Sequence, residues 1–317
     1  MSSAYRHSEA LKTRARELGF DACGVARAEP PDPEDRLGQW LAAGYHADMY
    51  WIAHTRDIRQ DATQKVPGAR SVVVVAHTYY QPRPAPPPGA AQVAMYAWGR
   101  DYHRVLIKPL RALADYLGML QPGTQSYAEI DSGPVLERCW AERAGIGWTG
   151  KNSLTLRQDM GSYFFLGTII TTAELAPGEP VADHCGSCRA CIDACPANAI
   201  VAEGVVDSRR CIAYQTIENR ADIPGDMQAN FGRWVFGCDI CQEVCPWNRF
   251  AKQTDTPDFT PRPHQVNPDA AELATLDAPT FHARYAGSPL MRPKHAGMVR
   301  NARIVLRNIR ESPEHGS

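Results

Sequence analysis

Eight of the chain's ten cysteines lie between residues 185 and 245, and their spacing is typical of iron–sulfur ligands. A 4Fe-4S cluster takes four thiolates, and in two-cluster ferredoxins the fourth cysteine of a C-x2-C-x2-C-x3-C-P run binds the other cluster. The chain has one such run, a second run that lacks its first cysteine, and a single cysteine between them. We therefore predict two 4Fe-4S clusters, a first one held by Cys185, Cys188, Cys191 and Cys245 and a second one held by Cys195, Cys211, Cys238 and Cys241.

Disulfides and structural zinc are two other uses of clustered cysteines. Closely spaced cysteines pair badly with one another, and nothing else in the chain is typical of a secreted protein. Zinc accepts four thiolates, but it gives no reason for the proline that follows both runs. The spacing therefore favours clusters over both alternatives. Cys23 and Cys139 lie outside the runs, and we expect them to be small buried apolar residues.

A second candidate for chemistry is the segment Gly99–His103, which directly precedes a predicted helix. Asp101 is well placed to cap the first turn of that helix, and this role explains Asp101 alone. Arg100, Tyr102 and His103 have no such explanation. We therefore take these three as candidate residues of a substrate pocket.

A third candidate is Asp131, which follows a predicted strand and precedes a predicted helix. Ser132 could cap that helix, with Pro134 in the first turn, where proline is tolerated. Asp131 would then be a carboxylate at the carboxyl end of a strand, where α/β sheets place their ligands. Spacing alone supports catalysis and capping equally as the role of Asp131.

The C-terminal part of the chain is basic, with seven lysines and arginines and no carboxylate from Phe281 to Arg310. At helical spacing one face would carry apolar residues and the other arginines. The apolar face would consist of Met298, Ala302, Val305 and Ile309, and the basic face of Arg300, Arg303, Arg307 and Arg310. A charged face is usually only solvated, but a solvated face ordinarily mixes acids with bases. This one favours a phosphodiester backbone as its partner.

The elements that must position these residues form an N-terminal α/β (α+β) unit. Ser71–Ala76 is apolar apart from its first residue, which predicts a central strand buried on both faces. Leucines from Leu106 to Leu117 predict a helix that Pro109 should kink. The Gly145–Asn152 loop could hold a phosphate, although it lacks the spacing of a P-loop. Further predicted elements are helices over Ser8–Leu18, Leu37–Leu41 and Ala47–His54 and from Pro134, strands over Phe20–Ala26, Ser126–Ile130 and Tyr163–Thr172, and a loop over Pro82–Gly89.

These elements and the cysteines divide the chain into three predicted parts. Residues 1–178 form the domain that holds the substrate, residues 179–250 form a ferredoxin-type module with two clusters, and residues 251–317 form a basic helical tail. The module depends on iron more than on a hydrophobic core.

The bulk composition indicates a globular protein, since 44% of its 317 residues are hydrophobic and 22% are charged. The 34 basic and 35 acidic residues nearly cancel, so any surface for nucleic acid must be local. Met1–Phe20 lack the apolar run of a signal peptide, and no apolar run approaches the roughly twenty residues of a membrane span. We expect no membrane association and a cytoplasmic location, where thiols stay reduced and available to iron.

Several segments together resemble the epoxyqueuosine reductase family. The likeness runs from the first predicted helix to about Asn308, and it is specific because the segments occur in the family's order around the double cysteine pattern. Besides both cysteine runs, the segments are Tyr96-Ala-Trp-Gly-Arg-Asp-Tyr-His103, Asp131-Ser-Gly-Pro-Val-Leu-Glu-Arg138, Ala144-Gly-Ile-Gly-Trp-Thr-Gly-Lys151, Phe236-Gly-Cys-Asp239 and Pro246-Trp-Asn248.

The resemblance implies an iron–sulfur enzyme that also binds cobalamin in a nitroreductase-like domain, with a short helical-repeat-like tail. It implies reduction of the epoxide of epoxyqueuosine to the alkene of queuosine at the wobble base of tRNA. Asp131 would be the proton donor, with a pKa raised by burial against the corrin, and Tyr102 would line the substrate side of the pocket. Cobalamin contacts are implied at His54, Asp131, Thr155, Leu166 and Ala213, and tRNA contacts at Glu218, Arg220, Arg292, Lys294, Arg300 and Arg303.

The predicted clusters require a source of single electrons. No G-x-G-x-x-G segment follows a strand, so we expect an external low-potential donor of the flavodoxin or ferredoxin class and not a bound nicotinamide. We expect the chain to act as a monomer. The main rival is a reductive dehalogenase-like corrinoid iron–sulfur enzyme that acts on a small molecule. Such enzymes typically carry a twin-arginine export signal, which is missing from this N-terminus.

Overall fold

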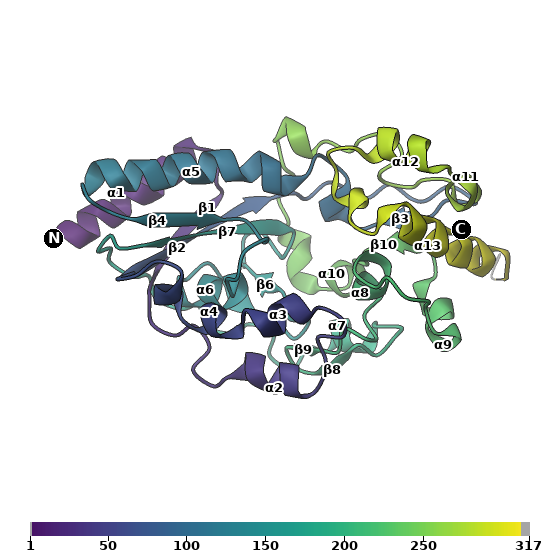
Figure 1. Ribbon diagram of the computed structural model, residues 1–317, viewed down its shortest axis with the longest axis horizontal. Helices are drawn as coiled ribbons and strands as arrows, with labels where there is room; N and C mark the ends of the chain where they lie inside the picture. Colours follow the sequence, from purple (N-terminus) through teal and green to yellow (C-terminus); the bar gives the residue numbers. More distant parts are fainter. Residues whose placement is uncertain (1, 312–317) are drawn as a thin grey trace.

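The computed structural model describes residues 2–311 and shows an elongated molecule, with a sheet domain at one end and the C-terminal helices at the other (Figure 1). The sheet has the strand order β1-β2-β7-β4, and every neighbouring pair is antiparallel. Its strands are β1 (Ala22–Arg27), β2 (Ser71–Thr78), β7 (Phe164–Thr171) and β4 (Ser126–Glu129). The predicted mixture of helices and strands is confirmed, in its α+β form and not as a parallel α/β sheet.

Strand β2 is the one around which both cores of the sheet domain form. All its residues are buried, as its apolar run predicted. Val73 and Val75 belong to one core, while Val72 and Val74 belong to the other. Alternate residues of a strand face opposite sides of the sheet, so one strand serves both cores.

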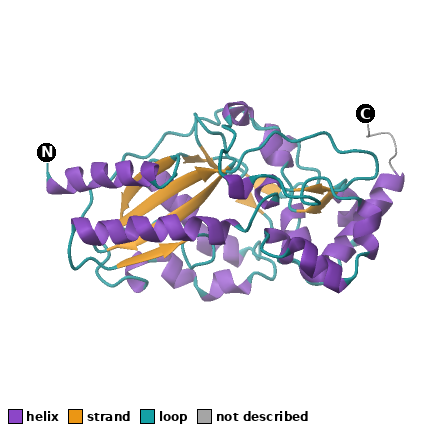
Figure 2. Ribbon diagram, turned by 90° about the horizontal axis from the view of Figure 1, so that it is seen from above, coloured by secondary structure: helices purple, strands orange, loops and turns teal. Residues whose placement is uncertain are grey.

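Helices cover both faces of this sheet. Figure 2 shows α1 (Ser3–Glu17) and α5 (Tyr102–Leu120) lying over one face, and α6 (Glu137–Arg143) packs against the other. Helix α5 continues through Pro109, because packing of its apolar face outweighs the lost hydrogen bond. That face contains the predicted residues Leu106, Leu110, Leu113 and Leu117, all buried.

The segment between β4 and α6 differs from the prediction. Helix α6 begins at Glu137 and not at Pro134, and no side chain caps it. Ser132 is therefore not a helix cap, and its hydroxyl donates to the Ile130 carbonyl at 3.2 Å. Asp131 has a left-handed φ of 57°, which turns the chain away from the strand direction. A turn thus occupies the positions where the sequence predicted a first helical turn.

The cysteine runs lie on short helices that contact each other, α7 (Ala190–Asp193) and α10 (Ile240–Glu243). Strand β10 (Trp234–Phe236) pairs in parallel with β3 (Gln92–Val93), which comes from the N-terminal part of the chain. Strand pairing therefore connects residues 1–178 with residues 179–250, so the two predicted parts are built into each other.

The C-terminal helix α13 (Lys294–Glu311) buries Met298, Ala302 and Val305 completely, as its apolar face predicted. None of the helices formed by residues 2–311 is long and apolar enough to cross a membrane. The remaining elements are α2 (Arg36–Ala42), α3 (Tyr50–His54), α4 (Arg56–Gln60), β5 (Trp148–Thr149), β6 (Thr155–Leu156), β8 (Ile200–Ala202), β9 (Val205–Val206), α8 (Ile212–Ile217), α9 (Gly225–Gln228), α11 (Ala270–Thr275) and α12 (Ala278–Tyr285).

A buried ion pair joins the proline-rich loop to the cysteine module. Asp239 pairs with Arg83 and accepts a hydrogen bond from the Met95 backbone N–H at 2.7 Å. The Arg83 guanidinium also lies between two rings, 4.8 Å from the centroid of Trp98 and 4.9 Å from that of Trp234. Burial raises the pKa of Asp239 to about 6 although Arg83 opposes this shift, so the carboxylate is ionised at neutral pH.

Replacing Arg83 by methionine should lower the free energy of unfolding by about 3–5 kcal/mol, because the buried Asp239 carboxylate would lose its charged partner. Urea unfolding of the anaerobic, cluster-loaded protein would measure this loss. Lys252→Met is a matched control, since the exposed Lys252–Asp159 pair at 3.7 Å should contribute only about 0–1 kcal/mol. Equal losses in both variants would show that the Arg83–Asp239 pair does not anchor the module.

Candidate functional site

Four cysteine side chains line one cavity of about 210 Å³. The thiols surround this space and do not converge on one point. Within residues 2–311, no three His, Cys, Asp or Glu side chains come together as the ligands of a single metal ion would. The four cysteines are Cys185, Cys188, Cys191 and Cys245, the same four that the spacing assigned to the first cluster.

The other four predicted ligands influence one another electrostatically. Burial raises the pKa of Cys238 well above its ordinary value, and Cys241 and Cys211 raise it further. Burial raises the pKa of Cys211 as well, with a smaller contribution from Cys195. These four thiols therefore lie near one another. Thiols with raised pKa values bind iron only as they lose their protons, so assembly of a cluster here would release protons.

The Gly145–Asn152 loop attaches the cysteine module to the sheet domain. The Lys151 ammonium donates to the Gly186 carbonyl at 2.7 Å and pairs with Glu203 at 2.7 Å. The Asn152 amide donates to the Cys241 carbonyl at 3.2 Å. The interpretation of this loop as a phosphate cradle is therefore wrong, because its lysine is already paired.

Asp131 lies against the first turn of α5, where Tyr102 and His103 meet it. The Tyr102 hydroxyl donates to Asp131 Oδ2, and His103 Nε2 lies 3.5 Å from the same oxygen. The Tyr102 ring is stacked between His103, at 4.0 Å between centroids, and Phe165, at 4.2 Å. Two residues of the predicted pocket are thus beside the predicted proton donor.

The backbone of Asp131 is held by Glu137, a residue that the sequence analysis did not single out. The Asp131 N–H donates to Glu137 Oε1 at 2.9 Å. Burial and the nearby Asp131 charge raise the pKa of Glu137 well above its ordinary value, which favours the protonated form of this carboxyl. The sequence signal for Glu137 was ambiguous, because an acidic residue in a first helical turn is common for reasons of helix stability alone.

The carboxylate of Asp131 is ionised in the chain itself. Burial alone would raise its pKa, but hydrogen bonds from His103 and Tyr102 outweigh burial and lower it. The raised pKa expected for Asp131 depends on burial against the corrin and stays a prediction. His103 shifts the opposite way: Asp101 and Asp131 overcome the effect of burial and raise its pKa to about 9. At neutral pH the two residues form an ion pair.

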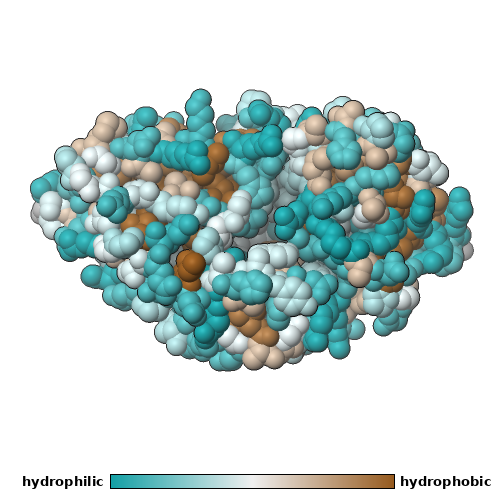
Figure 3. Space-filling model, viewed as in Figure 1, coloured by the Kyte–Doolittle hydropathy of each residue, from teal (hydrophilic) through white to brown (hydrophobic). Residues whose placement is uncertain are grey.

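A hollow lies in the middle of the molecular face, between the sheet domain and the C-terminal helices (Figure 3). In the same view, α3, β6, β7 and α8 surround it (Figure 1). Four of the predicted cobalamin positions lie on these elements: His54 on α3, Thr155 on β6, Leu166 on β7 and Ala213 on α8. The fifth, Asp131, lies in the turn after β4. The Thr155 hydroxyl is buried without a hydrogen-bond partner among residues 2–311, and 58% of the Asp131 side chain is exposed.

Arg100, the third predicted pocket residue, is not brought to Asp131. Its guanidinium pairs with Asp258 at 2.8 Å, and its backbone N–H donates to the Asp258 carbonyl at 2.8 Å. Arg100 fastens the segment before α5 to the C-terminal part of the chain. Its assignment to the pocket gains no support from this geometry.

The predicted tRNA residues lie along α8 and the C-terminal helices. Arg292 binds the Glu218 carboxylate through two nitrogens, at 2.9 Å each, and Arg220 donates to the Arg292 carbonyl at 2.7 Å. Arg300 is half-buried and donates to the Gln215 carbonyl at 2.9 Å. Its guanidinium also donates to the Ala221 carbonyl, so it holds α8 and the chain after α8 in place. Lys294 and Arg303 are exposed.

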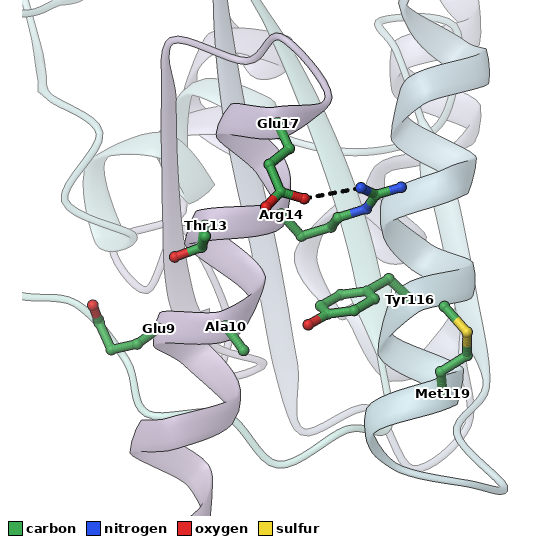
Figure 4. A pocket seen from close by; sticks show the side chains of 7 residues that line it. All are labelled: Glu9, Ala10, Thr13, Arg14, Glu17, Tyr116 and Met119. Atoms are coloured by element: carbon green, nitrogen blue, oxygen red, sulfur yellow. Dashed lines mark hydrogen bonds and ion pairs between the residues drawn. The ribbon is translucent and has the colours of Figure 1, made fainter.

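Another depression lies between α1 and α5, at the end of the molecule far from the two cysteine runs (Figure 4). Its charged residues pair with one another, since Arg14 binds Glu17 at 2.9 Å. We assign no chemistry to it. It is lined by Glu9, Ala10, Thr13, Arg14, Glu17, Tyr116 and Met119.

Comparison with protein families finds two matches. Residues 184–248 match the 4Fe-4S double cluster binding domain, and residues 59–132 match the domain described as epoxyqueuosine reductase QueG, DUF1730. The first match covers the cysteine runs and shows that the chain contains a double-cluster domain. The second includes Tyr102, His103 and Asp131.

Curated relatives named epoxyqueuosine reductase match nearly the whole chain. The protein of Gloeobacter violaceus is 44% identical over 303 residues, which are 93% of this chain and 94% of that one. The protein of a Synechocystis species is 46% identical over 285 residues, which are 89% of this chain and 98% of that one.

Solved structures of epoxyqueuosine reductases share the fold. One, determined with an epoxyqueuosine-modified tRNA-Tyr stem loop, has a TM-score of 0.89 at 28% identity and covers 98% of this chain and 83% of that one. Another, from Streptococcus thermophilus, has a TM-score of 0.85 at 26% identity and covers 96% of this chain and 82% of that one. On these matches, the chain belongs to the epoxyqueuosine reductase family.

Proposed function

We propose that this protein reduces the epoxide of epoxyqueuosine to the alkene of queuosine at the wobble position of tRNA, in the cytoplasm. The observation that carries this proposal is the Asp131 carboxylate, which Tyr102 and His103 hold beside the hollow in a chain of this family. The reaction adds two electrons and two protons, and the epoxide oxygen leaves as water. In this proposal the sheet domain is nitroreductase-like, and helices α11 to α13 form a short helical repeat.

The two ligand sets follow from the spacing and from the grouping of the thiols. The first cluster would be bound by the cysteines around the cavity, and the second by Cys195, Cys211, Cys238 and Cys241. Cys188 is exposed, so the first cluster would lie near the surface, where an external low-potential donor can approach it. Electrons would then enter at the first cluster, with the chain acting as a monomer.

Cys211→Ser tests this assignment, because Cys211 is the ligand that the run pattern does not identify directly. The variant should lose the second cluster and keep the first, so iron and sulfide should fall to about half of the wild-type content. Iron and sulfide assays with electron paramagnetic resonance would measure this loss. Cys139→Ser, outside both runs, should keep the full content; full content in Cys211→Ser would remove Cys211 from the ligand set.

The residues around the hollow fit cobalamin. Among residues 2–311 the buried Thr155 hydroxyl has no hydrogen-bond partner, and 58% of the Asp131 side chain is exposed. His54, Thr155, Leu166 and Ala213 would hold the corrin, together with Asp131. When bound, cobalamin would supply low-potential electrons to the epoxide.

The chain's own residues would supply orientation and protons. Tyr102, fixed by stacking on Phe165, holds Asp131 at the hollow. Asp131 would transfer a proton to the epoxide oxygen as the C–O bond breaks, which neutralises the developing alkoxide. A relative from Bacillus subtilis has a solved structure described as having its catalytic aspartate loop swung out of the active site. Asp131 also lies in a loop, where its left-handed backbone marks a conformation held by its surroundings.

Asp131→Asn should keep both clusters and bind the tRNA stem loop normally but lose turnover by about 10²-fold or more, because an amide cannot donate this proton efficiently. Single-turnover formation of queuosine by the reduced enzyme would measure the rate. The absorption spectrum and stem-loop affinity are the controls. Full activity in this variant would remove Asp131 from the mechanism.

The basic residues of α13 and of the segment before it would bind the tRNA backbone. Arg303→Gln should weaken binding of an epoxyqueuosine stem loop and reduce the slope of log K against log salt by about one, since one phosphate contact is lost. Lys12→Gln removes one positive charge at the far end of the molecule, on α1, and should leave the slope unchanged. Equal effects in the two variants would indicate that only net charge matters.

A further inference from the structure

The proposed reaction consumes two protons, and Asp131 is the one carboxyl that the proposal assigns to their delivery. In the chain itself that carboxyl is ionised, because it accepts hydrogen bonds from its neighbours. An ionised carboxylate cannot protonate the leaving oxygen. A second group must therefore hold the proton at rest and pass it on.

Three side chains form a line that meets this requirement. Asp101 Oδ1 lies 2.7 Å from His103 Nδ1, and His103 Nε2 lies 3.5 Å from Asp131 Oδ2. Asp101 thus engages one ring nitrogen and leaves the other directed at Asp131. This is the arrangement in which a carboxylate fixes the tautomer and orientation of an imidazole.

The position of the imidazole is fixed from several sides. Asp101 is the N-cap of α5 and accepts the His103 backbone N–H at 3.1 Å, and its own N–H donates to the Gly287 carbonyl at 2.9 Å. The His103 ring is stacked on Tyr102 at 4.0 Å. A capping residue alone would need neither this stack nor the second carboxylate.

The charges around His103 favour its protonated form. Asp101 and Asp131 each lie near one of its ring nitrogens, while the exposed Arg104 lies 3.8 Å from Asp101. Burial and the Asp131 charge raise the pKa of the Glu137 carboxyl, which disfavours a further negative charge beside Asp131. Arg59, Arg138 and Arg292 interact with the Asp131 charge without a hydrogen bond or ion pair to it, and among residues 2–311 none of the three has a hydrogen bond or ion pair with His103. Two carboxylates therefore share one imidazolium.

We propose that His103, oriented by Asp101, is the proton store of this site and recharges Asp131 during the reaction. This inference rests on the proposed function. Asp131 Oδ2 gives its proton to the epoxide oxygen, and Nε2 of His103 restores it. His103, whose side chain is 35% exposed, regains its proton from solvent. Two such transfers, with two electrons from the reduced enzyme, convert the epoxide to the alkene and water.

His103→Gln and His103→Gly test the proposal in single-turnover assays of the reduced holoenzyme with an epoxyqueuosine stem loop. Both variants should lose at least about tenfold in rate at pH 8, with stem-loop KM changed less than about twofold. The wild-type rate should fall as the pH rises through about 9, the pKa of His103. In His103→Gln this fall near pH 9 should disappear, because no imidazolium is left to recharge Asp131.

Added imidazole should restore much of the rate of His103→Gly, which a merely orienting role would not allow. Lys108→Gln, an exposed substitution on the same helix, should behave as wild type. A wild-type pH profile in His103→Gln, or a slow His103→Gly enzyme that imidazole does not rescue, would overturn the proposal.

A measurement without turnover separates this proposal from the proposed function. The imidazole resonances of His103 should titrate near pH 9 in the wild-type protein, and below the ordinary value of about 6.5 in an Asp101→Asn, Asp131→Asn double variant, where burial is no longer opposed by the two carboxylates. Titration near 6.5 in the wild type would overturn the proton store even if the enzyme makes queuosine. Titration near 9 in an enzyme that makes no queuosine would contradict the proposed reaction alone.

Discussion

The buried carboxylate of Asp239 fixes where the electrons can be delivered. It lies in the second cysteine run, and its partners come from the N-terminal part of the chain, the Arg83 guanidinium and the Met95 N–H. A buried charge without partners is costly, so the run can adopt this conformation only when the proline-rich loop and the segment after β3 are in place. The cysteine module and the sheet domain therefore have to be built together, and the position of the clusters relative to Asp131 follows from that.

Helix α8 connects three parts of the proposed function over a short distance. Cys211 precedes its first turn, Ala213 lies in that turn, and Glu218 follows its last turn and binds Arg292. A proposed cluster ligand, a proposed cofactor contact and the proposed tRNA edge thus share one rigid element. A tRNA bound at Arg292 would therefore be separated from the second cluster by one short helix.

Electrons and protons would reach the hollow from opposite sides. The clusters approach it through α8 and the cysteine runs, whereas the proton groups belong to α5 and the turn after β4. Because they are separate, the cluster side can bind iron while the His103 side exchanges protons with water. The cysteine side is buried around thiols, while His103 stays partly exposed and can exchange protons with water.

The sequence by itself determined the features that depend on local spacing. The number and spacing of the cysteines predict the double cluster, and the apolar run of β2 predicts its burial. Helical periodicity predicts the apolar faces of α5 and α13. Only the tertiary structure decided which distant side chains meet. It brought His103 and Tyr102 to Asp131, placed Glu137 beneath that residue, and took Arg100 away to Asp258. These contacts depend on an antiparallel strand order and on one left-handed residue in a turn, and neither leaves a periodic signal in the sequence.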